Sequence, residues 1–565
     1  MLVEDGTKIQ QHAQHDSRSD CLTGCVPPFD EAGMPRVDYF KATSAYAVKK
    51  HLESSRLADT AYVQLAVPLA PEAAPYVLFY VGTDNKFSHD DVRRRWKTTK
   101  RLLKNEGIKV IGFASDGDPK LLKAMLNETS FLSRLQRSKW GPFFIVNNIP
   151  LEHVYIQDII HLLNKIRNKL LNSKELKFGI LTIKKDHLQL LINTISKDKH
   201  GLNDTDASTK DRMKFDPTWR IMQKDVRDCL EEFVPGSEGT VMLLQLMSQI
   251  YEAYCEINLV PLERIFKIWH ALFLIRCWRH KCIESKSVGK ECITSNAYQC
   301  LELDAHGLVL LAEMCRDCPE QFLVLCFSSQ PAEEVFRELR SMTATNETAC
   351  EFSMKELGER LRNAFMKSQI SYRRKNDLKF NNIIRKQNKY PNPPHPMPTD
   401  DEVRVTIEKA RVQAAHDLLN LGITTEAHHF MDSMNVHDTS FEFVTTGISS
   451  DVDSDSDSDL EQPSHNIEFV STDDALGEDD ESGTESNEDE HSSVEDEIYD
   501  AEQLFANFKG ELKLRNSSTT KHTYRIRDST GKIHIIKKSK VVWMLSRGRS
   551  RPNSARLTRY RKQKP

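Results

Sequence analysis

Long apolar runs are missing from this 565-residue sequence. Its most apolar stretch, Ile265–Trp278, is interrupted by Lys267, His270 and Arg276. No segment therefore reaches the roughly 20 consecutive apolar residues that a membrane-spanning helix needs. The first residues, MLVEDGTKI, have neither the basic start nor the apolar centre of a secretion signal. The sequence predicts an intracellular protein that does not enter a membrane.

Cysteines at zinc-binding spacing and phosphate-binding loops are missing as well. The closest cysteine pairs, Cys21 with Cys25 and Cys315 with Cys318, have no second pair nearby. Because a structural zinc ion needs four ligands, we expect thiols here rather than a zinc module. No GxxxxGK[ST] loop occurs, since the Gly289–Lys290 pair has neither the leading glycine nor a following Ser or Thr.

Charge is segregated toward the C-terminus, although the net charge is only -4. Residues 451–500 hold 21 acidic residues and no Lys or Arg, whereas residues 501–565 hold 18 basic and 3 acidic residues. The acidic tract has too little apolar surface to offset the entropy cost of ordering, so we expect it to be disordered. It is either a plain linker or a competitor of DNA for the basic tail, which suits phosphate binding or nuclear import.

The first 171 residues alternate between strand and helix patterns in a distinctive order. Strands are expected at Leu2–Ile9, Cys21–Pro27, Tyr62–Val67, Tyr76–Val81, Lys109–Ser115 and Phe143–Asn147, and helices at Asp90–Asn105, Pro119–Leu126 and Gln157–Leu171. Antiparallel strands, a helix and then alternating strands and helices are typical of an RNase H-like nuclease core. The expected fold class is therefore α/β, with a mixed five-stranded sheet.

The stretch Val110–Lys120, VIGFASDGDPK, carries the clearest sign of chemistry. A buried strand ends at Asp116, and ligands of α/β folds gather at this end of a parallel strand. The alternative is that Asp116 or Asp118 only caps the helix that follows. An RNase H-like core collects acids from separate elements around two Mg²⁺ or Mn²⁺ ions. The first of these acids should lie on the opening strand and the second at the tip of a later strand. Asp5 and Asp116 have these two positions.

Several short sequence motifs resemble those of the P-element and THAP-domain transposases. They are GTDNKF (Gly82–Phe87), RRW (Arg94–Trp96), SDGDPKLLKAM (Ser115–Met125), the DIIHLLNKIRNKLL helix, Ile293–Leu311 and SSQPAEEVFRELRS (Ser328–Ser341). The resemblance implies that Glu334 is the third catalytic acid, and the adjacent Glu333 competes for this place. Pro331 stands where the family usually has Asp, and it also suits the start of a helix.

The resemblance further implies DNA strand cleavage and transfer at transposon ends, with Asp5, Asp116 and Glu334 as catalytic and metal-binding residues. His161, Lys165 and Arg167 lie on or near one polar side of a helix and are candidates for DNA binding, although His161 could also be a solvated or hydrogen-bonded core residue. Transposon ends, target DNA, a second copy of the chain, a nuclear location and GTP follow from the resemblance alone.

A non-catalytic function fits the sequence as well. Relatives carry a zinc-dependent DNA-binding module before the core, whereas this chain begins four residues before Asp5, so we expect the module to be missing. A domesticated or decayed relative could bind DNA or protein partners without cutting. The retained acids favour the enzyme, and the missing module and Pro331 favour the binding protein.

Six regions are expected along the chain. They are a first part of the RNase H-like core (1–171), an all-α insertion (172–292), a closing part of the core (293–365), a basic and Pro-rich linker with one helix (366–450), the acidic tract (451–500) and the basic C-terminal segment (501–565).

Overall fold

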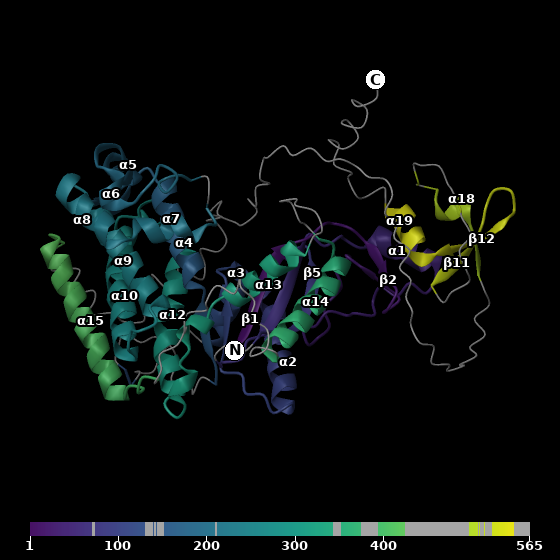
Figure 1. Cartoon of the computed structure of the whole chain (residues 1–565), viewed down its shortest axis with the longest axis horizontal. Coiled ribbons are helices and arrows are strands. Elements are labelled where there is room, and N and C mark those ends of the chain that lie inside the picture. Colours follow the sequence, from purple (N-terminus) through teal and green to yellow (C-terminus); the bar gives the residue numbers. More distant parts are fainter. Residues whose placement is uncertain are drawn as a thin grey trace, which may run out of the picture.

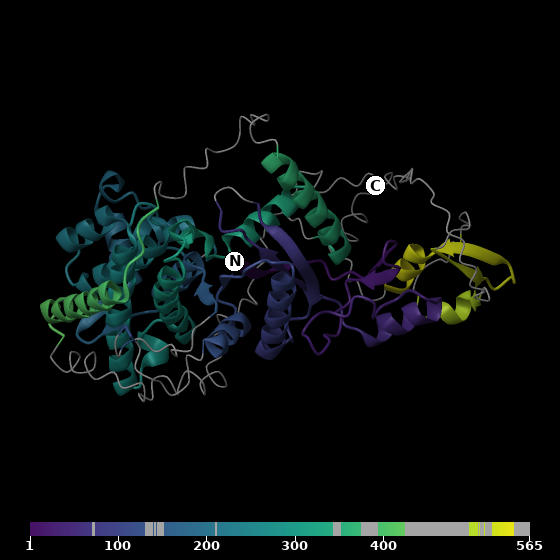
Figure 2. The same cartoon turned by 90° about the horizontal axis from the view of Figure 1, so that it is seen from below.

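The chain folds into three lobes (Figure 1). A computed structural model describes residues 1–70, 74–129, 139, 140, 143, 152–209, 212–342, 352–373, 394–423, 497–506, 508, 514 and 522–546. A sheet with its covering helices lies in the middle, a helical lobe lies on one side, and a small lobe with the C-terminal strands lies on the other. Figure 2 shows the same arrangement from below. Most of the predicted linker, acidic tract and basic tail lies outside the described residues.

The central sheet has the strand order β5-β4-β1-β6-β7. The strands are β1 (Leu2–Lys8), β4 (Thr60–Ala66), β5 (Tyr76–Thr83), β6 (Gly112–Ser115) and β7 (Val154–Gln157). β4 runs antiparallel to β1 and β5, whereas β6 runs parallel to β1 and β7. Every residue of β6 and β7 is buried, as is usual for parallel strands with both faces covered. The predicted α/β class and mixed five-stranded sheet are confirmed.

The fifth strand of the described sheet is Val154–Gln157, a segment for which the sequence pattern predicted no strand. The strand predicted at Phe143–Asn147 lies outside the described residues except for Phe143, whose ring packs edge to face on Phe273. The run Val154–Ile156 is short, but its β-branched and aromatic side chains suit a strand that is buried on both faces.

Side chains of β1 alternate between the two faces of the sheet. Glu4 points toward α2 (His89–Asn105), where it accepts hydrogen bonds from Arg95 and, at 2.8 Å, from Trp96 Nε1. Gln64 of β4 also donates to Glu4, at 3.2 Å. Asp5 points to the opposite face, which α13 (Gln330–Ser341) covers, and Thr7 on this face accepts a hydrogen bond from α13. The sheet thus carries a buried structural carboxylate on one face and Asp5 on the other.

The helical lobe is built from four long helices. α9 (Glu238–Cys255), α12 (Ser295–Met314) and α15 (Asp400–Asn420) pack against α10 (Pro261–Glu284), which is buried along most of its length. Arg276 of α10 makes a buried, bidentate ion pair with Glu302 of α12, in which both N–O distances are 2.6 Å. None of the helices in the described ranges is long and apolar enough to cross a membrane.

Further elements complete this lobe and the sheet lobe. They are α3 (Pro119–Glu128), α4 (Ile159–Asn172), α5 (Lys185–Thr194), α6 (Lys197–His200), α7 (Phe215–Ile221), α8 (Lys224–Phe233), α11 (Val288–Glu291), α14 (Met354–Arg373) and the 3-10 turns η1 (Pro319–Gln321) and η2 (Val324–Cys326). The predicted all-α insertion also contains a hairpin of β8 (Leu176–Phe178) and β9 (Leu181–Ile183). Alternating buried side chains and the positive φ of Gly179 in the turn favour this hairpin.

The small lobe combines two segments from opposite ends of the chain. β10 (Ile498–Asp500), β11 (Thr523–Arg527) and β12 (Ile533–Lys537) form its sheet, with α18 (Ala501–Leu504) and α19 (Lys538–Ser546). These elements share a separate hydrophobic core with α1 (Ala45–Ser54) and the hairpin of β2 (Gln14–Asp16) and β3 (Cys21–Thr23). The predicted strand Cys21–Pro27 therefore belongs to this hairpin and not to the central sheet, and β10 begins within the predicted acidic tract.

Replacing Arg95 should destabilise the fold. Arg95 is 1% exposed and pairs with Glu4, so Arg95→Ala would leave a buried carboxylate without its counter-charge. We expect the free energy of unfolding to fall by about 3–5 kcal/mol, measured by urea denaturation. Arg94→Ala is the matched control, because the Arg94 side chain is 52% exposed, and it should cost less than about 1 kcal/mol. Equal losses for the two variants would contradict this role of Arg95.

Candidate active site

Asp5, in the middle of β1, and Asp116, directly after β6, lie side by side on two parallel strands. The register of β1 with β6 pairs Glu4 with Ser115, so that the next residues of the two strands, Asp5 and Asp116, are neighbours. Asp5 is buried, and one of its carboxylate oxygens accepts a hydrogen bond from the backbone N–H of Gly6 at 2.7 Å. The structure thus brings the first two predicted acids together.

Asp118, and not Asp116, caps the helix that follows. The Asp118 side chain accepts hydrogen bonds from the backbone N–H groups of Lys120 and Leu121, at 2.8 and 3.1 Å, and begins α3. Its second oxygen accepts a hydrogen bond from the Tyr62 hydroxyl at 3.0 Å. The Asp116 carboxylate accepts only from the backbone N–H of Asp118, at 3.1 Å, among the hydrogen bonds of the described residues. The capping role that either residue could have filled is therefore filled by Asp118.

Both carboxyl groups of this pair hold protons unusually tightly. Burial raises the pKa of Asp5 well above its ordinary value, and the nearby Asp116 carboxylate raises it further. Burial and the charge of Asp118 raise the pKa of Asp116 to about 6, although His161 and Lys165 act in the opposite direction. The end of these strands is therefore short of positive charge, which is the setting in which a cation stabilises buried carboxylates.

Glu333 is the third acid that reaches this site. Its carboxylate accepts a hydrogen bond from His161 Nε2 at 2.5 Å, and its charge contributes to the raised pKa of Asp5. Glu334, the predicted third acid, is exposed to solvent. The structure therefore places Glu333, the alternative in the sequence, beside Asp5 and His161.

Helix geometry explains why the neighbour of the predicted residue faces the site. Ala332, Phe336 and Leu339 are the buried side chains of α13. At 100° per residue Glu333 lies on the flank of this buried stripe, whereas Glu334 lies almost opposite to it. The spacing of the apolar residues in the sequence therefore carried the information needed to choose Glu333.

Two of the three predicted DNA-binding residues border the acids. Burial alone would lower the pKa of His161, but the hydrogen bond to Glu333 and the charges of Asp158 and Asp116 raise it to about 10, so His161 is a cation. Lys165 Nζ donates to the Gly117 carbonyl at 2.9 Å. A Cβ atom at Gly117 would lie 2.0 Å from Lys165 Nζ, so glycine leaves the space that this lysine occupies.

Arg167 has a different position from the one expected. Its side chain is fully buried and donates to the backbone carbonyls of Asp206 and Ser208, both at 3.1 Å. It holds the segment before α7 against α4 and does not present its guanidinium to a phosphate backbone. On α4 it lies two residues from Lys165, which turns it about 200° around the helix axis.

Asn296 and Tyr62 were not singled out in the sequence but border the site. Asn296 of α12 accepts a hydrogen bond from Lys165 Nζ at 2.8 Å and donates to the Gly117 carbonyl at 3.2 Å. No local pattern marks Asn296, because it is brought to the site by the packing of α12 against α4. The helical lobe thus contributes directly to the surroundings of Asp116.

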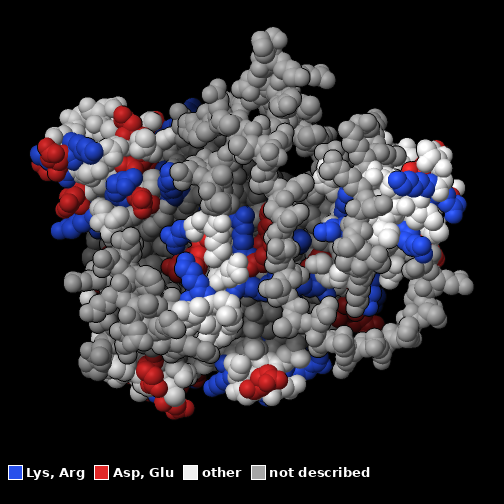
Figure 3. Space-filling model, turned by 45° about the vertical axis from the view of Figure 1, so that its right-hand side comes forward, with Lys and Arg blue, Asp and Glu red and all other residues white. Residues whose placement is uncertain are grey.

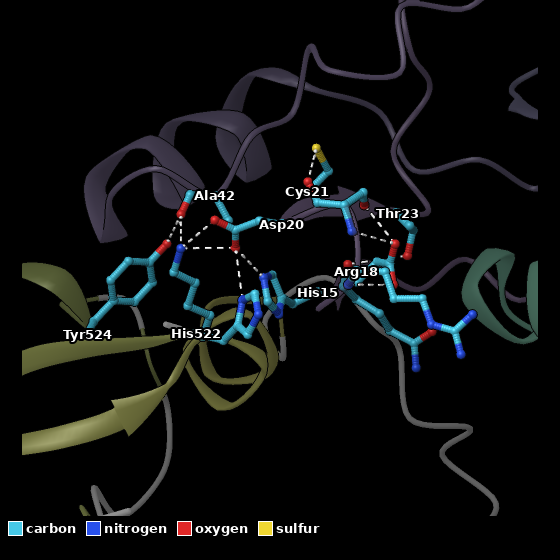
Figure 4. A network of polar contacts seen from close by, with 12 residues as sticks. His15, Arg18, Asp20, Cys21, Thr23, Ala42, His522 and Tyr524 are labelled. Carbon is cyan, nitrogen blue, oxygen red and sulfur yellow. Dashed lines mark hydrogen bonds and ion pairs between the residues drawn. The ribbon is translucent and has the colours of Figure 1, made fainter. Parts of the chain in front are cut away.

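A second cluster of titratable side chains lies in the small lobe (Figure 4). His15 Nε2 lies 2.8 Å from an oxygen of Asp20, and His522 Nδ1 lies 3.6 Å from the same atom. Ligand atoms of these three residues are within 4.8 Å of one another, a set that a zinc ion could use. Lys538 Nζ, however, lies 2.7 and 2.9 Å from the two Asp20 oxygens and already balances their charge. The geometry therefore favours an ion-pair network that joins the two segments of the lobe.

Comparison of the chain with models of protein families, with curated proteins and with solved structures finds no match.

Neutralising Asp116 should stabilise the folded protein at neutral pH. Because the folded-state pKa of about 6 exceeds the ordinary value of 3.8, ionisation of Asp116 lowers stability as the pH rises from about 4 through 6. In buffer without divalent cations, Asp116→Asn should raise the free energy of unfolding at pH 7.5 by about 1–3 kcal/mol, and this gain should vanish near pH 4.

The control for this measurement is Glu334→Gln, which changes an exposed acid and should alter stability by less than about 0.5 kcal/mol at either pH. Chemical denaturation followed by circular dichroism gives both values. A loss of stability in Asp116→Asn at pH 7.5 would contradict the electrostatic description of the site.

Proposed function

We propose that this chain is a transposase-like protein with an RNase H-like core, which cleaves and transfers DNA strands with the help of divalent metal ions. The observation that carries the proposal is the meeting of Asp5, Asp116 and Glu333 from β1, the end of β6 and α13. The sheet supports it as well, because two antiparallel pairs, β5-β4 and β4-β1, are followed by two parallel pairs, β1-β6 and β6-β7. This agrees with the expected succession of antiparallel strands, a helix and then alternating strands and helices.

The residues present fit a site for Mg²⁺ or Mn²⁺. Hard divalent cations take oxygen ligands, and Asp5, Asp116 and Glu333 supply carboxylate oxygens from three separate elements. The raised pKa values of Asp5 and Asp116 reflect a local lack of positive charge that such a cation would relieve. When bound, the ions would activate a water molecule or a 3′-hydroxyl and stabilise the oxygen that leaves the phosphodiester.

The neighbouring cations of the chain fit a phosphodiester substrate. His161 and Lys165 lie beside the acids and can donate hydrogen bonds to phosphate oxygens. Lys165 is fixed by Gly117 and Asn296, so its charge is already placed before DNA binds. His161 donates to one oxygen of Glu333, Oε1, and its positive charge competes with a metal ion for this carboxylate in the free protein.

The surface offers further basic groups to a nucleic acid. Figure 3 shows Lys and Arg side chains bordering acidic ones near the middle of one face, and more of them on the lobe at its right. Such mixed surroundings suit a phosphate backbone that passes basic residues and reaches a carboxylate centre. Transposon ends and target DNA are the proposed partners, the nucleus is the proposed location, and GTP use and oligomerisation remain predictions of the resemblance.

A second candidate function is DNA or protein binding without catalysis. The close pair of His161 and Glu333 favours it, because an imidazolium balances the third carboxylate where a metal ion would otherwise do so. The two candidates differ in one measurable property, since only the first requires the acids for strand cleavage.

Cleavage should depend on Glu333 and not on Glu334. Nicking of supercoiled plasmid DNA is measured with Mg²⁺ or Mn²⁺. Asp116→Ala and Glu333→Gln should lower its rate at least about 100-fold, because losing a direct metal ligand should cost more than losing an outer hydrogen-bond partner, which costs about 10- to 100-fold. Glu334→Gln, the matched control one residue away, should cut like the unaltered protein. Strand products on denaturing gels give the rates.

Equal nicking by the unaltered protein and Asp116→Ala would end the enzymatic proposal. No cleavage by either, combined with retained DNA binding in a mobility-shift assay, would favour the second candidate. Loss of cleavage in Glu334→Gln but not in Glu333→Gln would return the third place to Glu334.

A further inference from the structure

Asp158 sits where three elements of the candidate site meet. It is buried, with 1% of its surface exposed, and it lies between β7 and α4. Its backbone N–H donates to the carbonyl of Ser115, the residue before Asp116, at 2.9 Å. Asp158 is therefore linked to the end of β6 through its backbone, and its carboxylate remains for other partners.

The two carboxylate oxygens of Asp158 serve two different helices. Oδ1 accepts from the backbone N–H groups of Ile160 and His161, at 2.7 and 3.4 Å, and so caps α4. Oδ2 accepts from the backbone N–H and the hydroxyl of Ser329, at 2.9 and 2.8 Å, and from the Gln330 amide at 3.3 Å. One carboxylate thus joins the start of α4, which carries His161, to the start of α13, which carries Glu333.

We propose that Asp158 is a positioning residue that holds the N-terminus of α13 against α4, so that Glu333 and not Glu334 faces Asp5. This inference rests on the proposed function, because it assigns the third carboxylate its place in the metal-binding set. The hydrogen bonds fix Ser329 and Gln330, and Glu333 follows within one helical turn. A rotation of α13 by one residue would turn Glu333 away by about 100°.

The Ser-Gln pair at the start of α13, Ser329 and Gln330, supplies the donors for this contact. Ser329 does not cap its own helix with its side chain, and instead donates its hydroxyl to Asp158. Hydrogen bonds of this kind to a carboxylate are stronger than those between neutral groups, and here they are buried. The start of α13 is therefore held by Asp158 rather than by local capping.

A double-mutant cycle on the full chain tests this role. Asp158→Asn keeps an oxygen that can cap α4, but it turns an amide toward the Ser329 donors. We expect Mn²⁺ binding, measured by electron paramagnetic resonance, to weaken about 10- to 100-fold, the usual effect of losing an outer partner. In a Glu333→Gln background the same change should have no further effect on Mn²⁺ affinity, because Asp158 acts through Glu333.

Thr399→Ala is the control for a purely structural effect. Thr399 caps α15 on the far side of the helical lobe, so its loss should lower the melting temperature but leave Mn²⁺ affinity unchanged. Ser329→Ala removes the hydroxyl that donates to Asp158 and should also weaken Mn²⁺ binding. Ser329→Ala takes the place of Asp158→Asn in the cycle if Asp158→Asn does not fold.

The outcomes separate this inference from the proposed function. If the unaltered protein binds no Mn²⁺, the metal-dependent function fails and the role of Asp158 fails with it. If it binds Mn²⁺ but Asp158→Asn has no effect, or weakens binding equally with and without Glu333, only the positioning role is overturned.

Discussion

Asp5 and Asp116 are forced together because β1 and β6 run parallel in register, and their carboxyl groups repel each other in buried surroundings. This crowding of negative charge sets the requirements for the rest of the site. Lys165 and His161 of α4 and Glu333 of α13 all lie near these two carboxyl groups. His161 and Lys165, which both belong to α4, offset part of this charge. The pKa values of Asp5 and Asp116 nevertheless stay raised, because burial outweighs the effect of these two cations.

The helical lobe reaches the surroundings of Asp116 through α12. The ion pair of Arg276 with Glu302 fastens α10 to α12, and α12 delivers Asn296 to the loop that follows Asp116. Breaking a buried pair of this kind leaves an uncompensated charge, so it constrains how the two helices can lie. The rigidity of the lobe and the placement of Lys165 are thus connected through one helix.

Basic residues in this chain have two separate uses. Arg95, Arg167 and Lys538 are buried and satisfy carboxylates or carbonyl groups inside the protein, although their sequence surroundings look like surfaces that bind nucleic acid. Lys538 also joins the C-terminal segment to Asp20, near the start of the chain. A count of positive charge in the sequence therefore overstates the charge that faces a nucleic acid.

The sequence by itself determined the α/β class, the strand that ends at Asp116 and the amphipathic α4, because each depends on local periodicity and turn residues. The sequence also contains the spacing of Ala332, Phe336 and Leu339, which favours Glu333 over Glu334 as the residue that faces the site. The resemblance to the transposase motif had favoured Glu334 instead. Only the tertiary structure decided that Val154–Gln157 completes the sheet, that Arg167 is buried and that residues from Ala13–Leu52 and Tyr499–Met544 share one small lobe. These features depend on contacts between residues far apart along the chain, and the periodicity of a single segment carries no record of its distant partner.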